Sequence, residues 1–176
     1  MSQRNLLLFL FAGTLIMTLL MRWHGAPLSR FPESPAGIVS LELAKTKATT
    51  AAILSAWRER PVPNTIARAR QNTWLDFAFI LFYSLFLYTA CTVVARSFHP
   101  AHQSAAYSLA LLPLLAGLLD VLENAGMLWQ LSRGAEEWMA RATWCCALLK
   151  FTLLLAVVVW LICSPVWIWL GKLQKG

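Results

Sequence analysis

Residues 105–131 of the chain, AAYSLALLPLLAGLLDVLENAGMLWQL, combine a membrane-length apolar run with two acidic side chains. A helix of this length, at about 1.5 Å per residue, is long enough to cross a hydrocarbon core of about 30 Å. Its charged residues are Asp120 and Glu123, and the strongly polar Asn124 follows directly. Because ionisable groups are costly in hydrocarbon, we interpret each of these residues as a candidate functional residue with a partner inside the protein.

The rest of the chain has the same membrane character. Of its 176 residues, 59% are hydrophobic and 13% are charged, which is atypical of a water-soluble domain. Three further apolar segments cover approximately residues 5–22, 73–95 and 141–170, and they are interrupted by Asp76 in the second span and Lys150 in the fourth. The sequence therefore predicts an all-α integral membrane protein, in which residues 1–176 form a single domain of four transmembrane helices.

The first span resembles a signal peptide in one respect, because a short basic start precedes its apolar run. His24 stands, however, where a signal peptidase requires a small side chain. We therefore expect residues 5–22 to form a retained helix.

The connection over residues 24–71 is predicted to build a short amphipathic helical cap. One helix is expected to be capped by Ser34, with Pro35 in its first turn and side chains at helical spacing at Ile38, Leu41 and Lys45. A second helix is predicted within TTAAILSAW, residues 49–57, and Pro61 and Pro63 follow it. Such a pair of helices would lie on the bilayer surface or cap the bundle.

The start of the second span and the orientation of the chain follow from residues near the span ends. Asn64 is a candidate helix cap, so the second span is expected to begin near Thr65, outside the membrane. Ten basic residues lie on the side of the first connection and four on the other, which favours a cytoplasmic connection. Arg4 and the charged amino terminus favour the opposite orientation, in which the amino terminus is cytoplasmic and the first connection is not. The orientation of the chain therefore stays open.

The polar residues of the third and fourth spans are predicted to meet. Asp120, Glu123 and Asn124 are three and four positions apart and therefore share one helix face. The short connection at residues 132–141 makes the two spans antiparallel neighbours. Measured from this connection, Glu123 and Lys150 both lie about 12–14 Å deep, so an ion pair between them is feasible.

The charges of this predicted cluster do not balance. Asp76 enters from the second span, with Tyr83 two turns deeper on the same face, so three carboxylates meet one ammonium group. A protonated carboxylate, a bound cation, or Arg141 together with a basic residue of the first connection would correct the imbalance. Alternatively, the cluster is structural and sets the register of the helices.

Cofactors are constrained by the residue types in the spans. Asp76, Asp120 and Glu123 are candidate oxygen ligands for a divalent cation such as magnesium or calcium. No histidine lies in any predicted span, which disfavours a bis-histidine haem site. None of the GxSxG, HExxH or glycine-rich phosphate-binding motifs is present, so catalysis is left open.

These observations favour a membrane protein whose carboxylate and lysine site binds a small ligand, a lipid or a cation. The alternatives are an intramembrane enzyme that acts on a lipid-like substrate and an assembly or accessory subunit of a larger membrane complex. Expected partners are membrane lipids and either a second copy or a larger complex, whereas no recognition motif supports nucleic acid. The segments GIVSLELA, LDFAFILFYSLFL and DVLEN are similar to those of small four-span bacterial inner-membrane proteins, which implies that location.

Overall fold

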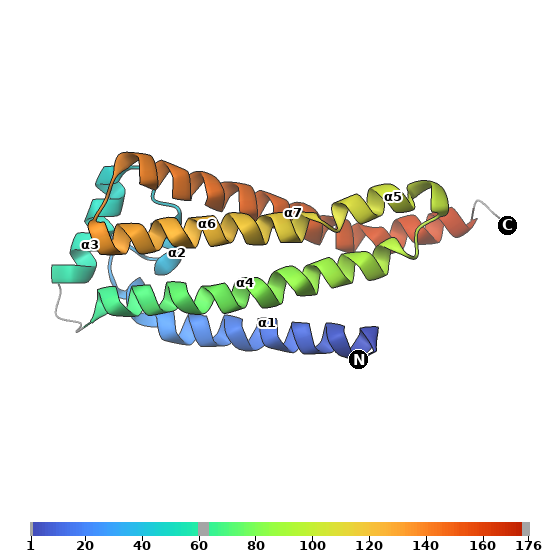
Figure 1. Ribbon diagram of the computed structural model, residues 1–176, viewed down its shortest axis with the longest axis horizontal. Coiled ribbons are helices and arrows are strands. Elements are labelled where there is room, and N and C mark those ends of the chain that lie inside the picture. Colours follow the sequence, from blue (N-terminus) through green and yellow to red (C-terminus); the bar gives the residue numbers. More distant parts are fainter. Residues whose placement is uncertain (1, 60–63, 174–176) are drawn as a thin grey trace.

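The computed structural model describes residues 2–59 and 64–173, and the described residues form helices and loops without a strand. Pro61 and Pro63, which were expected to end a cap helix, lie outside the described residues. In chain order the elements are α1 (Gln3–Gly25), the short 3₁₀ helix η1 (Ala26–Arg30), α2 (Ile38–Glu42), α3 (Lys47–Glu59), α4 (Thr65–Ala95), α5 (Pro100–Leu109), α6 (Leu112–Arg133) and α7 (Glu137–Leu173) (Figure 1).

Four helical segments of the described chain are long and apolar enough to cross a membrane, as the sequence predicted. They are Gln3–Arg30, Thr65–Ala95, Pro100–Arg133 and Glu137–Ile168. Each is longer than predicted, because the helices continue past the apolar residues into polar sequence. The longest helix, α7, has 37 residues, and at about 1.5 Å per residue it extends over about 55 Å.

The third predicted span is two helices and not one. α5 ends at Leu109, two turn residues follow, and α6 begins at Leu112 with Pro113 in its first turn. Proline has no backbone N–H, and its ring collides with the carbonyl group four residues earlier, so an uninterrupted helix through Pro113 is unfavourable. The break occurs where proline is tolerated, at the start of a helix.

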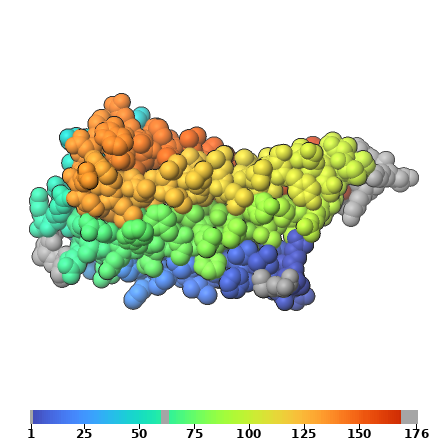
Figure 2. Space-filling view, in the orientation of Figure 1, coloured from blue at the N-terminus to red at the C-terminus, as the bar shows by residue number. Residues whose placement is uncertain are grey.

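The long helices pack as a row. α6 packs along α7 and α4, and α1 packs along α4 on the side away from α6 (Figure 1). In the space-filling view, α4 in green separates α1 in blue from α6 in yellow and orange (Figure 2). The outer face of α1 exposes large apolar side chains, among them Phe9, Ile16 and Leu19.

Small residues let the helices of this row approach closely. A Cβ atom added at Gly126 on α6 would overlap Thr143 Cγ2 on α7, and one added at Gly13 on α1 would overlap the Phe82 ring on α4. Close approach at small residues is typical of helices that pack inside membranes.

The predicted cap is present and covers the end of the bundle opposite α5 (Figure 1). Ile53, Leu54 and Trp57 of α3 are buried, and they form one apolar core with Leu28 and Leu41 of the connection. Met127 and Leu131 from the end of α6 complete this core. The amphipathic face of α3 therefore packs onto the protein, which agrees with the capping alternative.

Two predicted helix caps are wrong. Ser34 does not cap α2, because its Oγ atom donates to Leu28 O at 2.7 Å and accepts from Trp57 Nε1 at 2.9 Å inside the cap core. Gly37 occupies the N-cap position with φ 63°, a left-handed conformation that glycine adopts readily. α4 begins at Thr65 as predicted, but the Asn64 side chain makes no capping hydrogen bond.

The contact between α6 and α7 generates a stability prediction. Gly126→Ala is expected to lower the melting temperature in detergent, because the added methyl group forces α6 away from Thr143. Overpacking of this kind costs about 1–3 kcal/mol. Ala125→Val, on the exposed neighbouring position, serves as the control and should leave the melting temperature nearly unchanged. Equal melting temperatures for Gly126→Ala and the wild type would contradict the close packing.

Candidate functional site

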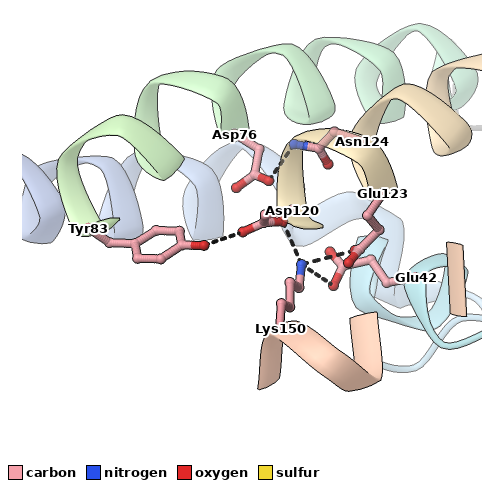
Figure 3. Close-up of polar contacts among 7 residues, drawn as sticks. All are labelled: Glu42, Asp76, Tyr83, Asp120, Glu123, Asn124 and Lys150. Atoms are coloured by element: carbon pink, nitrogen blue, oxygen red, sulfur yellow. Dashed lines mark hydrogen bonds and ion pairs between the residues drawn. The ribbon is translucent and has the colours of Figure 1, made fainter. Parts of the chain in front are cut away.

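Lys150 of α7 lies at the centre of a buried polar cluster between α4, α6, α7 and the cap. Its Nζ atom donates to Asp120 Oδ1 at 2.6 Å, Glu123 Oε1 at 3.0 Å and Glu42 Oε2 at 3.4 Å (Figure 3). The lysine side chain is 6% exposed and those of its partners are at most 9% exposed. The ion pair between Glu123 and Lys150 that the spacing predicted is therefore present.

The polar face of α6 is positioned by helical spacing and by the neighbours of α6. Asp120, Glu123 and Asn124 share one face, and all three are buried because α6 packs between α4 and α7. Lys150 projects toward this face from the antiparallel helix α7 (Figure 3). The short turn between α6 and α7 brings the two positions to matching depths.

α4 contributes two more residues, Asp76 and Tyr83, to this buried polar cluster. Asn124 Nδ2 donates to Asp76 Oδ2 at 2.7 Å, and the Tyr83 hydroxyl donates to Asp120 Oδ2 at 2.9 Å. Asp120 therefore accepts from Lys150 with one oxygen and from Tyr83 with the other. We refer to the seven residues drawn in Figure 3 as the Lys150 cluster: Glu42, Asp76, Tyr83, Asp120, Glu123, Asn124 and Lys150.

Two acceptor atoms inside the cluster have no hydrogen-bond partner. They are Glu123 Oε2 and Asn124 Oδ1, on side chains that are fully buried. A buried acceptor that faces no donor costs about 1–3 kcal/mol, and more when the group is charged. The cluster thus has unused capacity to accept hydrogen bonds or protons.

Glu42 was not among the residues expected at the site. It ends the short helix α2 in the cap, and the sequence shows it as an ordinary acidic residue between two leucines. One of the three predicted ways to balance the charges brought a basic residue of the first connection to the cluster, whereas the residue that reaches it is acidic. Burial raises the pKa of Glu42 above its ordinary value, and the nearby Lys150 ammonium opposes this shift in the pKa.

Arg141 does not join the Lys150 cluster, and this part of the prediction is wrong. Its guanidinium group is at the surface and pairs with Glu137 one turn earlier, at 2.8 Å. Basic residues of the cap are also engaged elsewhere, since Lys47 pairs with Glu136 at 3.4 Å and Lys45 lies over the Trp144 ring. Among the described residues of the cap, Glu42 reaches the site and no basic side chain does.

The arrangement differs from that of a preformed metal site. Among the described residues, no group of three or more His, Cys, Asp or Glu side chains is placed to hold a metal ion. Of the candidate ligands, Asp76 accepts a hydrogen bond from Asn124, whereas Asp120 and Glu123 both form ion pairs with Lys150 Nζ. The ammonium group occupies the point toward which these carboxylates are directed.

A cavity of about 630 Å³ lies elsewhere, between the end of α4 and α5. Hydroxyl and amide groups contribute to its lining, from Tyr88, Thr92, Gln103, Ser104, Tyr107 and Ser108. No member of the Lys150 cluster lines this cavity. The cluster and the cavity are therefore separate features of the molecule.

Comparison of the chain with protein-family models, with curated proteins and with solved structures finds no match. The chemistry of the Lys150 cluster is therefore argued from its own geometry.

The central ion pairs can be tested by a double-mutant cycle. Lys150→Met is expected to lower the free energy of unfolding by about 3–5 kcal/mol, because it leaves buried carboxylates facing one another. Asp120→Asn added to Lys150→Met should recover part of this loss, since it removes one of those carboxylates. Thermal or denaturant unfolding in detergent measures both effects. Strictly additive losses would show that the two side chains are not energetically coupled.

The raised pKa of Glu42 predicts a pH dependence of stability. The folded protein holds a proton on Glu42 more tightly than the unfolded chain does. The resulting stabilisation of the folded state is complete at pH values below the pKa of Glu42 in the unfolded chain. It is then lost as pH rises through the higher folded pKa. Glu42→Gln cannot ionise, so its melting temperature relative to wild type should improve as pH rises above 4.5.

Glu59→Gln is the matched control for this measurement, because Glu59 lies in the same cap but is exposed. Its melting temperature should follow that of the wild type at every pH. A constant difference between Glu42→Gln and wild type across the pH series would be the contrary result.

Proposed function

We propose that the chain is a four-span protein of the bacterial inner membrane that binds protons at the Lys150 cluster. The observation that carries this proposal is the ratio of charges in the site. The cluster holds four carboxylates, from Glu42, Asp76, Asp120 and Glu123, and one ammonium group, that of Lys150. Three of the carboxylates contact this ammonium group, and Asp76 accepts a hydrogen bond from Asn124 instead. Protons are the ligand class because they neutralise carboxylates without displacing the lysine.

The charge argument rests on the cost of burying ions. Full ionisation would leave three negative charges uncompensated among residues that are at most 8% exposed. Uncompensated ionised groups in a poorly solvated interior are so unfavourable that they take up protons instead. Glu123 Oε2, which is buried and faces no donor, is a specific atom at which a proton relieves this cost.

The path of polar residues favours a one-sided site over conduction across the membrane. From Phe151 to Cys163, α7 carries no ionisable side chain except the Cys163 thiol, and α6 carries none from Leu112 to Leu119. Proton relays through membranes use chains of ionisable side chains. The cluster therefore supports a role in sensing or responding to pH, with exchange from the cap side.

The other functions considered receive less support from the geometry. An enzyme that acts on a lipid-like substrate needs an opening onto its carboxylates, whereas the members of the Lys150 cluster are buried and the cavity beside α5 is elsewhere. An assembly role would use the exposed apolar faces of α1 and α7, which equally suit contact with membrane lipids.

Infrared spectroscopy of the protein in lipid nanodiscs tests proton binding directly. A protonated carboxyl group absorbs as a C=O stretch distinct from that of a carboxylate. At neutral pH the wild type is expected to show such bands, and Glu123→Gln should remove one or shift it. Raising the pH should abolish the bands as the protons leave.

Glu59→Gln, at an exposed position, should leave these bands unchanged. If no carboxyl band responds to Glu123→Gln or to pH, the cluster binds no titratable proton. It would then be a structural ion-pair network that sets helix register.

A further inference from the structure

We infer that α2 is a pH-responsive lid over the Lys150 cluster, held closed by protonated Glu42 and released toward the cap side when Glu42 loses its proton. This inference rests on the proposed proton-binding function and adds its route of access and its regulation. It is carried by the placement of Glu42, the construction of α2 and the charges that face it.

Glu42 is the member of the Lys150 cluster that does not belong to a long helix. Asp76 and Tyr83 are on α4, Asp120 and its neighbours on α6, and Lys150 on α7, whereas Glu42 is on the five-residue α2. α2 packs against α3, α4, α6 and α7, so it closes the cap end of the three long helices. Figure 3 shows Glu42 reaching from this cap segment to the lysine.

The segments on both sides of α2 allow it to move as a unit. Gly37 precedes it with φ 63°, and residues 43–46 after it are not helical. Its side-chain contacts are those of Leu41, buried in the cap core, of Ile38, partly buried against that core, and of Glu42, which is 7% exposed. A helix this short has few hydrogen bonds of its own, so its position depends on these side-chain contacts.

The charges around Glu42 determine the direction of the response. Facing it are Asp76 from α4, Asp120 and Glu123 from α6, and Lys150 from α7. The charged residues of α3, namely Lys47, Arg58 and Glu59, are exposed. A proton lost from Glu42 adds negative charge where acidic groups already exceed the single ammonium group. Of the four carboxylates, that of Glu42 can leave without displacing a long helix.

Burial raises the pKa of Glu42, which agrees with this direction because the closed position favours the neutral side chain. Opening of α2 exposes the cluster on the cap side, where the aqueous phase is nearest. On the other side, α7 from Phe151 to Ile162 carries no ionisable side chain, so this helix offers no route of ionisable groups away from the cluster. The lid therefore controls exchange with one compartment.

Hydrogen exchange measured by mass spectrometry over a pH series tests the lid, after correction for the pH dependence of intrinsic exchange. The reporters are the amides of Ser40, Leu43 and Ala44, which bond to Gly37 O, Val39 O and Leu41 O. In the wild type their protection should fall as pH rises, by up to about tenfold per pH unit. The α3 amides, such as Thr50 N bonded to Thr46 O, should stay protected.

The variants and controls separate the lid from general loosening. Glu42→Gln should keep α2 protected at every pH, whereas Glu59→Gln should behave as wild type. If α2 and α3 lose protection together as pH rises, the lid proposal is wrong. This comparison uses the wild type alone, so it remains possible if Glu42→Gln does not fold. Identical pH profiles for wild type and Glu42→Gln would overturn it as well.

Infrared spectra of the same samples distinguish the two proposals. If the carboxyl bands titrate but α2 protection does not change with pH, the lid is wrong and proton binding stands. If no titrating carboxyl band is present, proton binding itself fails and the lid fails with it.

Discussion

The buried ammonium group of Lys150 is the constraint on which the arrangement of this protein depends. A charge removed from water must be met by partners with good geometry, and no single helix can supply them. α6 supplies Asp120 and Glu123, and the cap supplies Glu42, so the bundle and the cap meet at one nitrogen atom. Tyr83 and Asn124 then extend the network to α4. The apolar core of the cap and the close contact at Gly126 hold these elements near enough for the network to form.

The parts of the site that the sequence predicted are those determined by local rules. Helical spacing places Asp120, Glu123 and Asn124 on one face regardless of the tertiary structure. The short turn between α6 and α7 then brings Glu123 and Lys150 to similar depths, which was enough to predict their ion pair. The spans themselves followed from the length of the apolar runs. The start of α4 near Thr65 was predicted from Asn64, although the side chain of Asn64 makes no capping hydrogen bond.

The parts that sequence reasoning missed depend on the path of the chain in space. Glu42 reaches Lys150 because the backbone turns at Gly37 and Leu41 is buried in the cap core. The glycine and the helical spacing of Leu41 are visible in GIVSLELAK, but neither of them indicates that Glu42 faces α7. Arg141 was considered for the cluster because it carries a positive charge that would reduce the imbalance, although Glu137 one turn earlier offered a nearer, solvated partner. The break between α5 and α6 did have a local signal, Pro113, which the uninterrupted hydropathy of the segment concealed.

The length of α7 has a consequence for the proposed membrane location. At about 55 Å this helix is nearly twice as long as a hydrocarbon core of about 30 Å is thick. In a bilayer, an ordinary tilt of about 20° would shorten its projection on the bilayer normal by only about 6%. The ends of α7 would then extend into the headgroup region, or the acyl chains around the helix would thicken locally. Under the proposed location, acyl-chain length would therefore be a variable to which this fold responds.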